Sequence, residues 1–125
     1  APAPLEDRLR AHPLVSQAVV VGDERPFVAA LVTIDEEAFV DWVVEVGLDA
    51  RTVAEAAETE DLRAAVRAAV DDANLSVSRA ESIREFAILP NDFTIDAGEL
   101  TPTLKVRRSV VHGRYQAVID SIYTA

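Results

Sequence analysis

Hydrophobic residues in the first third of the chain are concentrated in two runs separated by a polar turn. The runs VSQAVVV (15–21) and FVAALVTI (27–34) are rich in β-branched residues, and the intervening GDERP contains the glycine and proline that are typical of turns. This pattern predicts a β-hairpin with a longer loop. A later run, SIREFAIL (82–89), stops at Pro90 and predicts a third strand.

The segment between the second and third predicted strands has helical spacing instead. Asp35 is a suitable N-cap, and Gly47 is a residue that commonly ends a helix. Thr59 stands at a second helix start, and Thr52 with Glu55 forms the pattern of a capping box. The first apolar stripe comprises Phe39, Trp42, Val43 and Val46. The second predicts a helix over 60–77 and comprises Leu62, Val66, Ala69, Val70, Ala73 and Val77.

Both ends of the chain also predict helices. Pro4 can open a helix, Leu5 and Leu9 lie one turn apart, and Pro13 disfavours helix at the residue before it. The polar segment 90–103 predicts a loop. A final helix would be lined by Val106, Val110, Val118 and Ile122. The order αββαααβα predicts an α/β (α+β) fold with about three strands, including a β-hairpin, packed with helices.

Length and composition limit the number of domains and the classes of function that the chain can have. A chain of 125 residues is long enough for one compact domain, so we expect 1–125 to be a single domain. The absence of cysteine excludes disulfides, thiolate catalysis and thiolate metal sites. A formal net charge of −10 argues against general binding to nucleic acid or to anionic membranes. No apolar run approaches the ~20 residues that span a bilayer. The absence of cysteine fits a reducing cytoplasm, where we expect the protein to be. The N-terminus has neither an initiator methionine nor a signal-peptide pattern, so we expect Ala1 to be a cut point.

One short segment, LTPTLKVRR (100–108), departs from the charge pattern of the rest. It contains Lys105, the only lysine among twelve lysine and arginine residues, together with Arg107 and Arg108. We expect the last helix to begin here, where each cation costs up to ~1 kcal/mol unless an anion is bound nearby. The cluster therefore predicts a phosphate or carboxylate site, with pairing to the chain's own acids as the alternative. A lysine retained among arginines favours a role for a compact, flexible ammonium.

Other reactive side chains form weaker patterns. His12 precedes Pro13 at a predicted helix end, where capping or exposure explains it, and His112 has no carboxylate partner nearby in the sequence. Two separated histidines without cysteine are a poor zinc set, so we expect no metal site. The serines lack the Gly-x-Ser-x-Gly context of a nucleophile, and no glycine motif for phosphate is present.

Two stretches of the sequence, which follow one another in the order expected for a known family, resemble that family. LEDRLRAHPLVSQAVVVGDERPFVAALVT (5–33) is similar to the helix, turn and hairpin of the C-terminal domain of long-chain acyl-CoA synthetases (AMP-forming), members of the adenylate-forming superfamily. LTPTLKVRR is similar to that domain's catalytic-lysine motif, so the resemblance covers essentially the whole chain. Many relatives have glycine directly before the lysine. Leu104 stands there in this chain, as in the long-chain branch, which by analogy favours long acyl substrates.

The resemblance implies a specific role. Such ligases use Mg-ATP to convert a fatty acid into an acyl-adenylate and then transfer the acyl group to CoA. The resemblance implies that Lys105 is the adenylation lysine, whose ammonium stabilises negative charge near the α-phosphate. Arg107 and Arg108 become candidates for contacting nucleotide or CoA phosphates, although pairing with the domain's own acids explains them equally well. Because acetylation removes the ammonium charge, we expect acetylated Lys105 to be inactive.

The resemblance also implies partners that this chain does not contain. ATP, Mg²⁺ and the fatty acid would be held by an N-terminal adenylation domain of the same protein, so we expect the chain alone to form no acyl-CoA. The full enzyme would be cytoplasmic or peripheral at the membrane. Two alternatives remain open: a fatty-acid–AMP ligase that loads a carrier protein, and a freestanding acidic binding module without catalysis.

Overall fold

Three strands form one mixed sheet in the computed structural model, which describes residues 2–124. β1 (Val15–Val21) pairs antiparallel with β2 (Val28–Ile34), and β2 pairs in parallel with β3 (Ile83–Ile88), so that β2 is the central strand. The predicted hairpin and third strand are therefore confirmed. So is the α/β (α+β) fold class with three strands.

The central strand is buried on both faces, which explains its nearly continuous hydrophobic sequence. Successive side chains of a strand point to opposite faces of the sheet. Ala30 and Val32 accordingly belong to one hydrophobic cluster, whereas Ala29 and Leu31 belong to another on the opposite side. The domain thus has a packed layer on each face of a single sheet.

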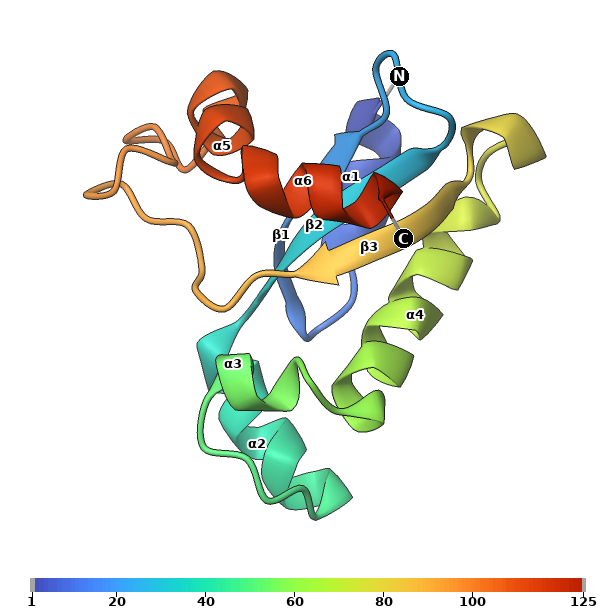
Figure 1. The fold of residues 1–125 in the computed structure, drawn as a ribbon. Coiled ribbons are helices and arrows are strands. Elements are labelled where there is room, and N and C mark those ends of the chain that lie inside the picture. Colours follow the sequence, from blue (N-terminus) through green and yellow to red (C-terminus); the bar gives the residue numbers. More distant parts are fainter. Residues whose placement is uncertain (1, 125) are drawn as a thin grey trace.

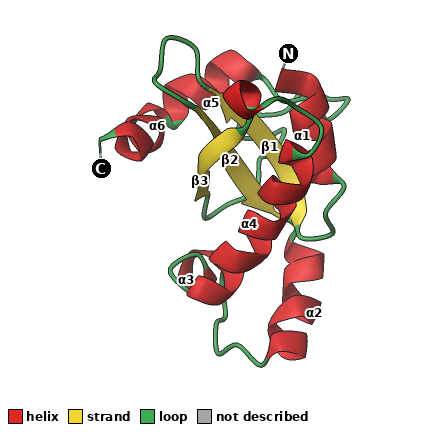
Figure 2. Cartoon of the chain, turned by 90° about the vertical axis from the view of Figure 1, so that its right-hand side faces the viewer, coloured by secondary structure: helices red, strands yellow, loops and turns green. Residues whose placement is uncertain are grey.

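Helices from the two ends of the chain cover different faces (Figures 1 and 2). α1 (Pro2–Arg10) and α4 (Glu60–Asn74) contribute to the first cluster, and α5 (Arg108–Arg114) and α6 (Gln116–Tyr123) contribute to the second. α2 (Glu36–Val46) and α3 (Val53–Ala56) extend beyond one end of the sheet (Figure 1). A short 3-10 helix, η1 (Arg79–Glu81), precedes β3.

The capping residues predicted from the sequence are found at the starts of α2, α3 and α4 and at the end of α2. Asp35 Oδ1 accepts a hydrogen bond from Ala38 N at 2.9 Å at the start of α2. The Thr52 and Thr59 hydroxyls cap α3 and α4 in the same way. Gly47 ends α2 in the left-handed conformation, with φ of 70°. These capping positions are confirmed.

The predicted helix 60–77 is three residues too long. α4 ends at Asn74, whose side-chain amide bonds to both backbone groups of Ile83, with 2.8 Å to Ile83 N and 2.9 Å from Asn74 Nδ2 to Ile83 O. This contact joins the end of the helix to the start of β3. Leu75, directly after the helix, is 81% exposed, whereas Val77, the last residue of the predicted stripe, lies outside the helix but still packs partly buried against the first cluster.

Two further expectations are wrong in detail. The final helix is two helices, because Tyr115 leaves helical geometry (φ −106°, ψ 21°) while its hydroxyl reaches a buried carboxylate on the preceding loop. In α2, Phe39 is buried and Trp42 is half-buried against the first cluster, but Val46 is 45% exposed. The stripe on α2 therefore faces the core only in part.

Candidate functional site

Lys105 lies on the returning arm of a small closed loop formed by residues 100–106, called the lysine loop below, directly before Val106. Leu100 and Val106 form an antiparallel bridge at its base. Thr101 N donates to Lys105 O at 2.8 Å, and Lys105 N donates to the Thr101 hydroxyl at 3.0 Å. The side chain of Lys105 is exposed, and it forms no ion pair with any other residue of the range 2–124. The backbone around the lysine is therefore fixed, while its ammonium faces outward.

The residue before the lysine has an unusual backbone conformation. Leu104 has φ of +66°, in the left-handed region that glycine adopts without a steric cost. Its side chain is 60% exposed. A left-handed backbone at this position explains physically why a glycine fits directly before the lysine in a motif of this kind.

The expectation that Lys105 stands at a helix start is wrong. α5 begins at Arg108, three residues later, and Arg107 is its N-cap without a side-chain capping bond. Lys105 instead belongs to the loop closed by the bridge between Leu100 and Val106. The helix-dipole argument therefore does not apply to Lys105, and the exposed, unpaired ammonium is what remains of the predicted anion site.

The two candidate arginines differ in their surroundings. Arg108 forms an ion pair with the buried Glu6 of α1, whose other oxygen accepts from Val20 N at 2.7 Å. Arg107 donates its backbone N–H to Glu99 O at 2.8 Å, and its side chain is exposed and makes no ion pair with the described residues. Arg108 is thus engaged within the domain, whereas the guanidinium of Arg107 is available to an external anion.

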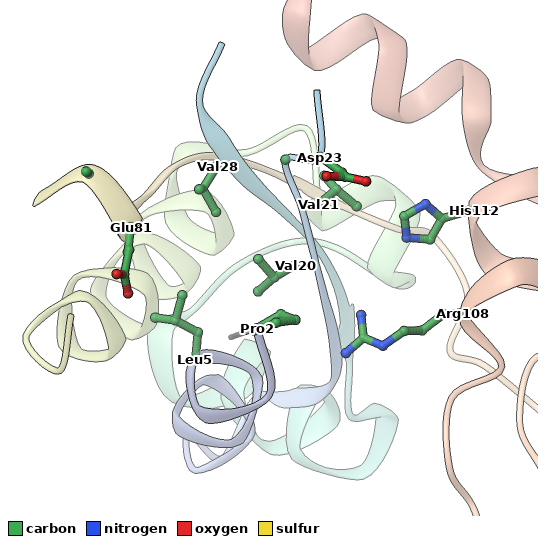
Figure 3. A pocket seen from close by; sticks show the side chains of 11 residues that line it. Pro2, Leu5, Val20, Val21, Asp23, Val28, Glu81, Arg108 and His112 are labelled. Carbon is green, nitrogen blue, oxygen red and sulfur yellow. The ribbon is translucent and has the colours of Figure 1, made fainter. Parts of the chain in front are cut away.

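Two hollows lie beside these residues. The smaller, of ≈ 280 Å³, is polar and adjoins the lysine loop; its lining is Glu6, Arg10, Gln17, Leu104, Lys105, Val106 and Arg108. The larger, of ≈ 540 Å³, has an apolar floor that includes Leu5 and Val20. Figure 3 shows Arg108 and His112 reaching into it from one side and Glu81 from the other. Lys105 does not line the larger cavity.

A buried carboxylate beneath the lysine loop was not recognised in the sequence. Glu99 is 3% exposed and accepts hydrogen bonds from the Tyr115 hydroxyl at 2.9 Å and from Thr94 N at 3.2 Å. Arg114 forms an ion pair with it at 3.2 Å. Burial, followed by the bond and the charge of Glu99, raises the pKa of Tyr115 above its usual value of 10.0, so that its hydroxyl remains a donor. The only sequence signal for Glu99 is an acid within a polar loop next to the cationic segment.

The two histidines have different roles. His12 Nδ1 accepts from Leu14 N at 3.2 Å, a local bond consistent with the capping role expected for it. His112 is half-buried at the larger cavity. Within residues 2–124, no group of three or more histidine, cysteine, aspartate or glutamate side chains is placed to hold a metal ion. The same residues contain no helix with both the length and the apolar character needed to cross a membrane.

Known proteins are similar to this chain in both sequence and fold. Residues 1–125 match the family model described as AMP-binding enzyme C-terminal domain. Long-chain-fatty-acid–CoA ligase FadD15 of Mycobacterium tuberculosis is 58% identical over 124 residues, which cover 98% of this chain and 21% of that protein. Long-chain-fatty-acid–CoA ligase ACSBG2 of Gallus gallus is 34% identical over 140 residues, covering 98% of this chain and 18% of that protein.

Solved structures of adenylation enzymes contain a domain with the same fold as this chain. The A-PCP didomain of carboxylic acid reductase from Segniliparus rugosus, in complex with AMP, matches with a TM-score of 0.74 at 25% identity, covering 98% of this chain and 16% of that chain. The adenylation domain of a Mycobacterium chelonae carboxylate reductase has the same fold, with a TM-score of 0.76 at 21% identity and coverage of 100% and 18%.

The match to the family model covers the whole chain, whereas the chain spans only about a fifth of the length of the curated relatives. The resemblance seen in the segments 5–33 and 100–108 is therefore confirmed. By the match of its whole sequence to the family model, the chain belongs to the family of AMP-binding enzyme C-terminal domains.

Proposed function

We propose that residues 1–125 act as the C-terminal domain of a long-chain fatty-acid–CoA ligase and that Lys105 is its adenylation lysine. The observation that carries the proposal is the exposed ammonium of Lys105, unpaired among the described residues, on a loop closed by backbone hydrogen bonds. The 58% identity to FadD15 supports the substrate class.

The mechanism assigned to this domain is electrostatic. In the first half-reaction a carboxylate oxygen of the fatty acid attacks the α-phosphorus of ATP, forming the acyl-adenylate and releasing pyrophosphate. Lys105 would place its ammonium beside the oxygens where negative charge increases, and a donor fixed in advance stabilises such a transition state. The lysine forms no covalent bond and transfers no proton in this scheme. In the second half-reaction the thiol of CoA displaces AMP, a step that does not require Lys105.

The remaining components would come from outside this chain. An N-terminal adenylation domain of the same protein would hold ATP and the fatty acid. By the same resemblance, the Mg²⁺ that accompanies ATP would be bound by that domain as well. The exposed side chain of Arg107 is suited to a phosphate of ATP or CoA. Arg108 has a weaker case, because it is paired with Glu6.

The test is the substitution Lys105→Ala in the full-length protein that contains this domain. We expect acyl-adenylate formation, measured as pyrophosphate release from fatty acid and ATP, to fall by about 10²–10³-fold, because one charge-stabilising donor is removed. Conversion of supplied acyl-adenylate and CoA into acyl-CoA should be nearly unchanged. Lys105→Arg should restore only part of the rate, since a planar guanidinium does not reproduce a compact ammonium.

A matched control is Arg79→Ala, which removes an equally exposed cation from η1, on the other side of the molecule (Figure 1). This variant should keep both half-reactions. Equal losses of both half-reactions in Lys105→Ala would show that the residue is structural and would contradict the proposal.

The second candidate differs only in the acyl acceptor. The structural match to a didomain containing a carrier protein favours transfer to a carrier thiol in place of CoA. Incubation of the full-length protein with fatty acid, ATP and either acceptor separates the two, because only the true acceptor gains the acyl group. The higher sequence identity to CoA ligases leads us to expect acyl-CoA.

A further inference from the structure

Glu99 lies where the lysine loop leaves the body of the domain, and it joins three parts of the chain. Its Oε1 accepts from Thr94 N, at the start of the segment that leads into the loop. Its Oε2 accepts from the Tyr115 hydroxyl and pairs with Arg114, at the junction between α5 and α6. We infer that Glu99 is the positioning residue that sets the place of Lys105 relative to the sheet and α5; this inference rests on the proposed function.

The backbone of Glu99 adds a second connection. Its carbonyl oxygen accepts from Arg107 N at 2.8 Å, directly outside the bridge between Leu100 and Val106. Both arms of the loop therefore meet at Glu99, and Lys105 lies within residues 100–106, the seven residues between Glu99 and Arg107. Because the carboxylate is bonded to the body of the domain and the carbonyl to the far side of the loop, displacing Glu99 would move the whole loop as a unit.

The surroundings of Glu99 keep this arrangement rigid. Arg114 also donates to Ala97 O at 2.8 Å, so the arginine holds the loop before Glu99 as well as the carboxylate itself. The ring of Tyr115 lies 6.1 Å from that of Phe93, which is buried in the cluster beneath α6. A buried carboxylate with several donors is held firmly, since any displacement leaves unpaired polar groups without water.

The experiment compares Glu99→Ala and Glu99→Gln in the full-length protein. In Glu99→Ala we expect kcat for acyl-adenylate formation to fall by about 10²-fold, because displacement of a reacting group by about 1 Å has a cost of that order. KM for ATP and the rate of thioester formation from supplied acyl-adenylate should change little. Glu99→Gln keeps one accepting oxygen, which can still bond to Thr94 N, while its NH2 group can donate to the Tyr115 hydroxyl, so its loss should be clearly smaller.

A double variant separates positioning from general damage. If Glu99 acts through the lysine, Glu99→Ala combined with Lys105→Ala should be no slower than Lys105→Ala alone, because coupled residues are not additive. A further loss in the double variant would overturn the inference. Hydrogen exchange of the full-length protein gives a second measure: Glu99→Ala should accelerate exchange of the amides of 100–107 and leave those of 60–74 unchanged.

Failure of this inference can be told apart from failure of the proposed function. If Lys105→Ala abolishes adenylation but Glu99→Ala leaves it intact, only the positioning role of Glu99 is wrong. If Lys105→Ala itself leaves adenylation intact, the proposed function is wrong whatever Glu99 does. Equal losses of both half-reactions in Glu99→Gln, with exchange accelerated throughout the domain, would show that Glu99 supports the fold and not the lysine.

Discussion

At the scale of single residues, the backbone at Leu104 gives the lysine loop its shape. Its left-handed conformation lets the chain turn between Thr101 and Lys105, which are joined by two hydrogen bonds. A residue with a Cβ has a steric cost of about 1–2 kcal/mol in this conformation. The exposed leucine is therefore retained against a local backbone preference, next to the residue proposed to act on the substrate.

A pair of leucine substitutions tests this strain. Leu104→Gly should leave the domain at least as stable as the original, because glycine relieves the left-handed strain. Leu75→Gly should lower the free energy of unfolding by about 0.5–1 kcal/mol, because Leu75 is similarly exposed but has an ordinary φ of −63°. Denaturant unfolding of the two variants measures the difference. If both leucines respond alike, Leu104 is not strained.

The surroundings of a side chain could be predicted from the sequence only where they depend on residues close to it along the chain. The exposure of Lys105 agrees with the prediction of an accessible ammonium, and the pairing of Arg108 with an acid was one of the two alternatives considered. The identity of that acid, Glu6, was not predictable, because it lies 102 residues away along the chain. Glu99 was missed for the same reason: its partner Tyr115 approaches only when the last helices fold onto the sheet.

At the scale of elements, the strands and the starts of α2, α3 and α4 followed local rules, whereas the start of α5 and the end of α4 did not. Asp35, Thr52 and Thr59 cap through bonds that span three residues, so the sequence alone specifies them. The end of α4 depends on Asn74 bonding to Ile83 of another element. The break at Tyr115 likewise depends on a partner outside the helices.

Two glycines provide a prediction at this scale. Gly47→Ala should lower the free energy of unfolding by about 1 kcal/mol, since nothing within 4 Å of an added Cβ would clash and the cost is that of the left-handed backbone. Gly113→Ala, inside α5 and equally open, should raise it by up to about 1 kcal/mol because alanine is the better helix former. Thermal unfolding checks both. Equal destabilisation by the two changes would contradict this account.

At the scale of the whole molecule, Glu6 connects elements that are far apart in sequence. This carboxylate from α1 bonds to β1 at Val20 N and to α5 at Arg108, across the edge of the sheet. It lines the polar hollow that Lys105 also lines. The position of α5, and with it the far end of the lysine loop, thus depends partly on the first helix.

Removal of the Glu6 side chain tests whether this connection stabilises the domain. Glu6→Ala should lower the free energy of unfolding by about 1–3 kcal/mol, because the half-buried Val20 N–H loses its acceptor and Arg108 its partner. Glu85→Ala removes a half-exposed carboxylate that is 3.9 Å from Arg67 and should change stability by no more than about 0.5 kcal/mol. Chemical denaturation compares the two variants. A loss for Glu6→Ala as small as that for Glu85→Ala would show that the link is unimportant.

The sequence by itself determined the strands, the starts of α2, α3 and α4, the fold class and the segment that carries the lysine. These features depend on interactions within a few residues, such as caps and turns, and on the continuous hydrophobic run along β2. Only the tertiary structure decided that the final helix breaks at Tyr115, that Lys105 stands on a closed loop ahead of α5, and that Glu99 holds this loop. Each of these features depends on groups brought together by packing on the sheet, and a local pattern contains no information about such partners.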